Sequence, residues 1–265
     1  MIKEIKYQNK NIFYQTFGSG KPVMFVHGFG EDANVWKDQS AHLQENFFLI
    51  VPDLPGSGQS EAIDDMSMEG LAEVLHSIIH EEDITACIMI GHSMGGYITL
   101  AFAEKYWNHL QAFGLLHSTA FADSEEKKAI RKKGIEFIEQ HGAFEFLKTS
   151  TPNLFSKEFK TSSPGIVNEF IDSLKDFNAQ SLISYYRAMM NRPDRTALLK
   201  NSNFKILFVF GEFDNAVPLQ DGLKQCYLPL NSFIHILKKT GHMGMMEEPG
   251  KTNRILQDFL IAASL

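Results

Sequence analysis

The stretch Gly91-His92-Ser93-Met94-Gly95 decides the fold. An apolar run at residues 84–90 precedes it and predicts a buried strand, and residues 94–106 have the composition of a helix. A G-x-S-x-G sequence between a strand and a helix is typical of a sharp turn that exposes the serine hydroxyl. Glycine is needed on both sides because a side chain there would collide with the neighbouring strand and helix. The pentapeptide alone arises by chance in roughly one chain in ten of this length, so its context must support the prediction.

Other segments supply that context in order along the chain. Residues 22–26 end at His27-Gly28-Phe29-Gly30, residues 49–52 lead into Asp53, residues 204–210 end at Gly211-Glu212-Phe213-Asp214, and residues 233–237 precede Gly241-His242. Together these segments resemble the α/β-hydrolase superfamily, whose catalytic residues run Ser, acid, His. The resemblance covers roughly residues 20–118 and 204–262. It implies an α/β fold with a mostly parallel central sheet flanked by helices.

The hydrophobic pattern agrees with this fold class. From residue 23 onward, short apolar strands alternate with longer helical stretches, a pattern typical of a parallel sheet. Residues 2–7 and 12–16 alternate as antiparallel strands do, and residues 8–11 between them have turn composition. We expect helices at residues 34–44, 67–80, 94–106, 219–226 and 249–262, and one more strand at residues 113–116.

The strand rhythm stops between about residue 120 and residue 203, where several helices are expected, including 124–140 and 180–190. The resemblance implies a helical cap over the carboxyl ends of the strands, the edge at which open α/β sheets bind ligands. We therefore predict a hydrolase core at 1–119 and 204–265 and a cap insertion at 120–203. Arg192-Pro193-Asp194 is interpreted as a helix stop. The cap holds eight phenylalanines, most of which should pack inward: Phe121, Phe137, Phe144, Phe146, Phe155, Phe159, Phe170 and Phe177.

The resemblance assigns a catalytic triad. Ser93 is the predicted nucleophile, and it needs a base because a serine hydroxyl is weakly nucleophilic. His242 is the predicted base, and Asp214 is the acid that fixes its tautomer and stabilises the imidazolium. Glu212 is the local competitor for the acid, whereas Asp53 precedes the serine and is expected to bond its own turn. A serine nucleophile also argues against dehalogenases and epoxide hydrolases, which the resemblance says would carry aspartate.

Two backbone amides should form the oxyanion hole. One belongs to Met94, directly after the nucleophile, and the other to Phe29 in the loop after the third strand. His27 and His92 flank this region and are expected to hold the loop and the turn by hydrogen bonds.

The sequence predicts no cofactor and no metal. His76 and His80 are four residues apart on one helix face, but no H-E-x-x-H pattern accompanies them. Gly56-Ser57-Gly58 and Gly18-Ser19-Gly20-Lys21 are glycine-rich, yet neither completes a dinucleotide or phosphate-loop pattern.

Composition limits the partners. The chain has 265 residues, 44% of them hydrophobic, and its net charge of −7 disfavours nucleic acid or an anionic membrane. We see no signal-peptide pattern and no apolar run near the roughly 18 residues that span a bilayer. Cys87 and Cys226 are expected to be reduced packing residues. A cytoplasmic location is the default expectation, and the oligomeric state stays open.

These observations leave three functional hypotheses. The first is a serine hydrolase that cleaves a small-molecule carboxylic ester or lactone through an acyl-enzyme. Its substrate would be largely apolar, because an unpaired charge beneath a phenylalanine-rich cap is costly. The second keeps the triad but cleaves a C–C bond, acts as an aminopeptidase, or is a lyase. The third is a ligand receptor or signalling protein with a retained triad, which very slow turnover with tight ligand binding would favour.

Overall fold

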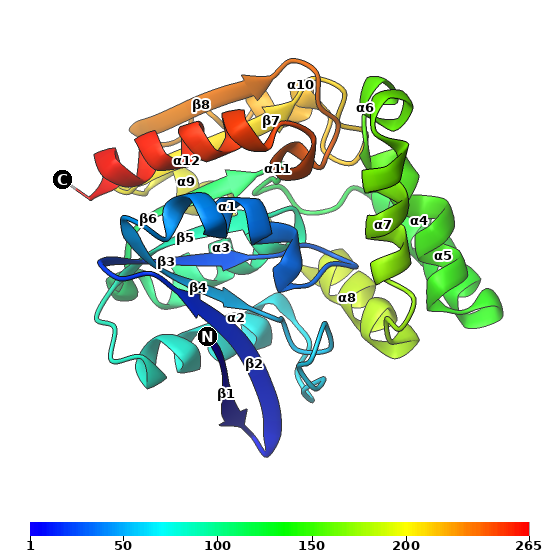
Figure 1. The fold of residues 1–265 in the computed structure, drawn as a ribbon, viewed down its shortest axis with the longest axis horizontal. Coiled ribbons are helices and arrows are strands. Elements are labelled where there is room, and N and C mark those ends of the chain that lie inside the picture. Colours follow the sequence, from blue (N-terminus) through cyan, green and yellow to red (C-terminus); the bar gives the residue numbers. More distant parts are fainter. Residues whose placement is uncertain (265) are drawn as a thin grey trace.

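Eight strands form one central sheet in the computed structural model, which describes residues 1–264 (Figure 1). The strand order is β1-β2-β4-β3-β5-β6-β7-β8. Strand β2 runs antiparallel to β1 and β4, and every other neighbouring pair is parallel, which confirms the predicted fold class. The strands are β1 (Ile2–Tyr7), β2 (Lys10–Phe17), β3 (Lys21–Val26), β4 (Phe47–Pro52), β5 (Cys87–His92), β6 (Leu110–Leu116), β7 (Lys205–Gly211) and β8 (Asn231–Leu237).

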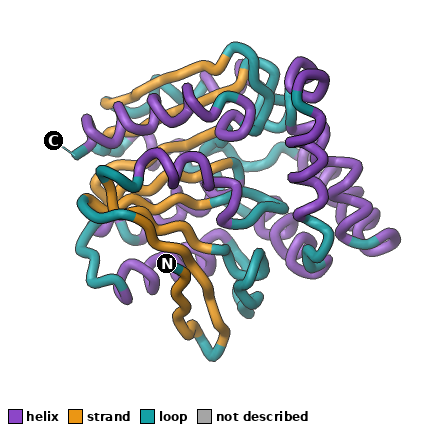
Figure 2. Tube along the Cα trace, in the orientation of Figure 1, coloured by secondary structure: helices purple, strands orange, loops and turns teal. Residues whose placement is uncertain are grey.

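Helices cover both faces of the sheet (Figure 2). Helices α2 and α3 pack on one face, and α1 and α12 pack on the other. The helices of the two flanking layers are α1 (Lys37–Leu43), α2 (Met68–Glu81), α3 (Met94–Lys105), α10 (Leu219–Leu223), α11 (Gly244–Glu247) and α12 (Pro249–Ala263). Between β6 and β7 lie α4 (Glu125–His141), α5 (Ala143–Ser150), α6 (Lys157–Ser162), α7 (Pro164–Ser173), α8 (Ala179–Asn191) and α9 (Thr196–Lys200).

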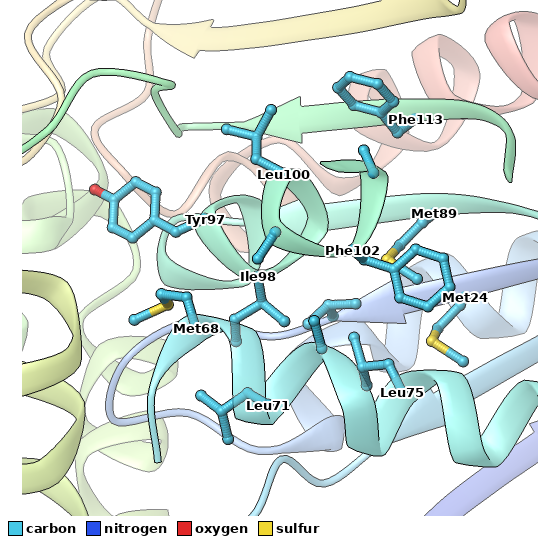
Figure 3. Packing of buried hydrophobic residues seen from close by; sticks show 14 of the residues in the cluster. Met24, Met68, Leu71, Leu75, Met89, Tyr97, Ile98, Leu100, Phe102 and Phe113 are labelled. Carbon is cyan, nitrogen blue, oxygen red and sulfur yellow. The ribbon is translucent and has the colours of Figure 1, made fainter. Parts of the chain in front are cut away.

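Alternate residues of β3 enter the two halves of the core. Met24 joins the cluster beneath α2 and α3, whereas Phe25 joins the cluster beneath α1 and α12, and both are fully buried. Successive side chains of a strand point to opposite faces, so a sheet covered on both faces needs apolar residues at nearly every position. Figure 3 shows the first cluster, in which Leu71 and Leu75 of α2 lie in one layer with Ile98 and Phe102 of α3. This doubly covered core explains why the central strands are continuous apolar runs.

Several predicted element boundaries are wrong, including the start of β6, which begins at Leu110 instead of residue 113. Strand β5 spans Cys87–His92 instead of 84–90, because the turn at Asp83 has a positive φ and the chain enters the sheet only afterwards. Helix α10 ends at Leu223 instead of residue 226, and turns follow it. The helix expected at 34–44 begins with a 3-10 turn at Ala33–Trp36 before α1.

The helices between β6 and β7 occupy the region in which a cap is predicted. Helices α4–α8 gather beyond one end of the sheet, at the right of Figure 1. Of its eight phenylalanines only Phe137 is exposed, which confirms that most pack inward. The guanidinium of Arg192, just after α8, donates to Asp123 Oδ1 at 2.8 Å and lies 3.8 Å from the centre of the Tyr97 ring. Helix α8 ends at Asn191, directly before Arg192-Pro193-Asp194, which confirms the predicted helix stop.

Two further sequence expectations concern cysteine and the membrane. Cys87 and Cys226 are both buried and unpaired, as predicted. Within residues 1–264, no helix combines the length and the apolar character that crossing a bilayer requires.

Candidate active site

Ser93 lies on the turn between β5 and α3 with φ 50° and ψ −115°, an unusual conformation for a residue that has a Cβ. A Cβ at Gly91 would lie 2.4 Å from the carbonyl oxygen of Gly95, and one at Gly95 would lie 2.3 Å from that of Val26. Both glycines are therefore required, as the sequence predicts. Ser93 is half-buried, so the expectation of an exposed serine is wrong. The loop after β6 packs on the turn, and Ser118 Oγ donates to the Ser93 carbonyl at 2.7 Å.

Asp214 and His242 are brought together by the loops after β7 and β8. His242 Nδ1 donates to Asp214 Oδ2 at 2.8 Å, and both side chains are buried. The other carboxylate oxygen, Oδ1, accepts the backbone amides of Ala216 and Val217, each at 2.8 Å. The competing carboxylate, Glu212, is exposed. The imidazole is therefore held by Asp214 and not by Glu212.

A second imidazole, which the sequence analysis missed, contacts the same carboxylate. His117 follows β6 directly, and its Nδ1 lies 3.1 Å from Asp214 Oδ2. Burial is the main cause that lowers the pKa of His117 to about 4, so the ring is neutral at pH 7. Because the carboxylate can only accept, the proton is on Nδ1 and Nε2 carries the lone pair. That Nε2 is buried without a hydrogen-bond partner among the described residues, and an unmet buried acceptor costs about 1–3 kcal/mol.

The charge of Asp214 is firmly held. Burial alone would raise its pKa, but the charge of His242 and the hydrogen bonds from the two imidazoles hold the pKa well below the usual range. Two amides and two imidazoles together use the lone-pair sites of the carboxylate. The acid is therefore ionised throughout the neutral range.

His92 forms a buried ion pair with Glu31, a residue that the sequence analysis also missed. His92 Nδ1 lies 3.0 Å from both oxygens of Glu31, and its Nε2 donates to the carbonyl of His242 at 3.0 Å. Burial opposes protonation, but the charge and hydrogen bond of Glu31 raise the pKa of His92 overall. Both ring nitrogens face acceptors only, so the ring is an imidazolium. Glu31 directly follows the Gly28-Phe29-Gly30 loop, a position that could have signalled its role.

The amides of Phe29 and Met94 are both free to bind an anion, since neither donates a hydrogen bond within residues 1–264. Met94 is the first residue of α3, where helix amides and the helix dipole favour negative charge. Glu31 accepts the amide of Gly28 at 2.7 Å and so fixes the loop that carries Phe29. His27 Nε2 accepts the amide of Leu54 at 2.9 Å, so His27 and His92 brace the loop and the turn as expected.

Helix α8 lies against the same loop. The ring of Tyr186 stacks on Phe29 with centroids 4.3 Å apart and planes 11° apart, and Phe146 of α5 meets Phe29 edge-on at 6.3 Å. Tyr185, which the sequence analysis did not single out, is buried and donates its hydroxyl to the carbonyl of Pro55 at 2.6 Å. Aromatic side chains therefore cover the loop that carries one of the two free amides.

A cleft of about 1240 Å³ opens between α6 and the segment after β7. Its lining includes Asp214, the apolar side chains of Phe155 and Leu219, and the exposed ring of Phe213. Ser93 is not among the lining residues, so a pocket directly above the serine stays a prediction.

The other candidate residues have local roles. His76 stacks on Tyr106 with ring centres 4.1 Å apart, whereas His80 is exposed. Asp53 accepts the amide of Gln59 at 3.0 Å and so bonds its own turn. Within residues 1–264, the one cluster of potential metal ligands with closely spaced donor atoms is the hydrogen-bonded set of His117, Asp214 and His242.

Comparisons with known proteins agree with this fold. A sequence model described as the alpha/beta hydrolase fold matches residues 21–249. The chain is 24% identical to 3-oxoadipate enol-lactonase 1 of Acinetobacter baylyi, over 96% of this chain and 94% of that protein. It is 26% identical to a 2-hydroxy-6-oxononadienedioate/2-hydroxy-6-oxononatrienedioate hydrolase of Pseudomonas putida, over 94% and 92%. A thermophilic esterase from Thermogutta terrifontis superposes with a TM-score of 0.92 at 27% identity, covering 99% of both chains.

Proposed function

The chain belongs to the alpha/beta hydrolase fold family, and from this premise we propose that it is a serine hydrolase of small-molecule carboxylic esters or lactones. The observation that carries the proposal is the contact between His242 and Asp214 next to a strained serine turn. The 24% identical enol-lactonase and the 27% identical esterase support the choice of bond.

In the proposed acylation step, Ser93 Oγ attacks the substrate carbonyl carbon while His242 Nε2 takes the hydroxyl proton. Asp214 keeps the opposite ring nitrogen protonated and stabilises the imidazolium that forms. The amides of Phe29 and Met94 bind the oxyanion. When the intermediate collapses, the C–O bond to the leaving alcohol breaks and His242 returns the proton to that oxygen. A lactone would open in the same way without releasing a separate alcohol.

Deacylation repeats these steps with water as the nucleophile. His242 removes a proton from the water, the hydroxide attacks the acyl carbon, and Ser93 leaves with the proton that His242 returns. Within the described part of the chain, no hydrogen bond joins Ser93 Oγ to His242 Nε2, and neither atom bonds to a further group, so both are available to the reactants. In ligand-free enzymes the contact between nucleophile and base is often long and tightens only in the substrate complex.

The proposed enzyme has a core at 1–119 and 204–265 and a cap at 120–203 that covers the site. Contacts of Tyr186 and Phe146 with Phe29 support a cap placed over the oxyanion loop. This aromatic cover favours an uncharged, largely apolar acyl group, because an unpaired charge there would be desolvated. Two buried free thiols suit a cytoplasmic protein.

A second candidate reaction is hydrolysis of a C–C bond, favoured by the 26% identity to the Pseudomonas putida hydrolase. The same nucleophile, base and oxyanion amides would serve, with a carbon leaving group in place of oxygen. Activity on vinylogous diketones without activity on simple esters would favour it.

The test is a panel of p-nitrophenyl esters, lactones and vinylogous diketones, run on the purified protein and on Ser93→Ala. We expect turnover of esters or lactones that Ser93→Ala abolishes, and stoichiometric labelling of Ser93 by a fluorophosphonate. Turnover that survives in Ser93→Ala, or an adduct that mass spectrometry places on another serine, would contradict the assignment. Turnover below one per minute on every substrate would favour the receptor hypothesis.

A further inference from the structure

We propose that His117 is a positioning residue of the triad, which fixes the Asp214 carboxylate so that this carboxylate in turn fixes His242. The proposal rests on the proposed function, because it concerns the same three-residue site. Its starting point is that two imidazoles donate to one oxygen, Asp214 Oδ2, at 2.8 Å from His242 and 3.1 Å from His117.

The two oxygens of Asp214 are held from different sides. Oδ1 accepts the amides of Ala216 and Val217, which belong to the same turn as Asp214. These two bonds fix the position of one carboxylate oxygen. Only Oδ2 faces the histidines, and a single donor there would leave the carboxylate and His242 free to tilt together. His117 supplies an independent second donor from the end of β6. The orientation of His242 is therefore anchored to a third strand end.

His117 is a poor choice of residue if packing were its only task. Its φ of 49° lies in the left-handed region, which glycine adopts more easily than any residue with a Cβ. Its Nε2 is buried with no partner among residues 1–264. A Cβ at Gly244 would lie 2.5 Å from that nitrogen, so the neighbouring turn must leave room for the ring. The fold accepts both costs, and within the described part of the chain the ring hydrogen-bonds to Asp214 alone.

Titratable groups face His117 from every neighbouring strand end. Asp214 faces it from the loop after β7, His242 from the loop after β8 at a ring distance of 5.7 Å, and His92 from β5 at 5.9 Å. Glu31 balances the charge of His92 from the far side. The neutral ring of His117 thus supplies a donor to Asp214 without placing another positive charge, besides that of His92, next to His242.

The test compares His117→Asn with His117→Gly, because both residues tolerate the left-handed backbone but only asparagine retains an N–H donor. With the best ester of the panel, we expect kcat of the asparagine variant to stay within about threefold of the parent. The glycine variant should lose roughly ten- to a hundredfold in kcat with little change in KM, as misplaced catalytic groups do. His109→Asn, at a half-buried histidine remote from the triad, is the control.

The pH profile and NMR provide readouts that a packing role would not change. Loss of the donor leaves Asp214 with more uncompensated charge toward His242, so the acid limb of kcat/KM should move to higher pH in His117→Gly. In the parent protein, ¹⁵N NMR should find His117 neutral and protonated on Nδ1. A glycine variant with the parent's kcat and pH profile, and only a lower thermal midpoint, would overturn the proposal.

Two further experiments cover the cases in which a variant does not fold or the protein shows no activity. If His117→Gly does not fold, the nearly isosteric pair His117→Asn and His117→Leu replaces it, because leucine cannot donate to Asp214. Equal kcat in that pair would also overturn the proposal. If the parent protein neither labels at Ser93 nor turns over any substrate, the proposed function fails. The His242 Nδ1 proton signal of the parent and of His117→Asn would then still test the contact, and an unchanged signal in His117→Gly would reject it.

Discussion

Glu31 and His92 form an ion pair in which both side chains are buried and His92 Nδ1 lies 3.0 Å from each carboxylate oxygen. Glu31 also holds the amide of Gly28, and His92 also holds the carbonyl of His242. The loop that carries the amide of Phe29 and the loop that carries His242 are therefore joined through one charge pair.

Glu31→Gln should lower the free energy of unfolding at pH 7 by about 3 kcal/mol, because it leaves a buried imidazolium without its counterion. The folded pKa of His92 is raised, so the pair's stabilisation is full below the unfolded pKa and is lost as the pH rises through the folded one. Urea unfolding from pH 5 to 9 should show this loss in the parent and not in the variant. The control is Glu73→Gln, whose partner Lys105 is exposed and whose loss should be far smaller. Equal losses in the two variants would refute the charged state of His92.

Asp214→Asn should reduce kcat much more than it changes KM, because an amide favours the wrong tautomer and cannot stabilise the imidazolium. In a serine protease the corresponding change costs roughly 10⁴-fold in turnover. Glu212→Gln is the matched control and should retain activity, since Glu212 is exposed. Steady-state kinetics with the reverse ranking would move the acid to Glu212.

Ser93→Gly should be more stable than Ser93→Ala by about 1 kcal/mol, because glycine relieves the positive φ of the turn and alanine does not. Both variants lack the nucleophile, so neither should react with a fluorophosphonate. Urea titrations of the two inactive proteins measure the difference. Coincident unfolding curves would show that the turn holds no strain.

The stability of the protein should fall between pH 6.5 and 4 partly because of His117. Its pKa drops from 6.5 to about 4 on folding, so over that interval the unfolded chain binds a proton that the folded one excludes. The expected loss is about 3 kcal/mol at the acid end. His117→Asn removes this titration, and its unfolding free energy should depend less on pH by that amount. Parallel pH curves for the parent and the variant would contradict a neutral, buried His117.

The specificity constant for p-nitrophenyl esters should rise from acetate to butyrate and then fall for long chains. Each buried methylene contributes roughly 0.8 kcal/mol, or about fourfold if the gain is realised in the transition state. Ser93→Ala supplies the background rate for each ester. A flat profile, or a preference for palmitate, would argue against a bounded apolar pocket beneath the cap.

Local motifs made much of this architecture predictable. The parallel sheet follows from apolar runs alternating with helical stretches, and the serine turn follows from glycines whose added Cβ atoms would meet backbone carbonyls. The predicted start of β5 is wrong because apolar composition does not show where a chain enters a sheet. Three residues outside the sheet separate the turn at Asp83 from Cys87, and no sequence pattern indicates where the pairing begins.

The supporting residues of the site could not be predicted in the same way. His117 is 97 residues from Asp214, and Glu31 is 61 residues from His92, so neither contact belongs to a local motif. Each residue follows a strand or loop already identified, but only the sheet order brings those ends together. The charge states of His92, Asp214 and His117 could not be predicted either, because they depend on burial and on partners that are distant in the sequence.

The stack of Phe29 on Tyr186 links the loop after β3 to helix α8. Tyr186 belongs to α8, and the backbone of Phe29 carries one of the two free amides. Any displacement of α8 wide enough to admit a substrate must part these rings and loosen the residue that aims the amide. The position of the Phe29 amide and the position of α8 are therefore coupled through this one ring contact.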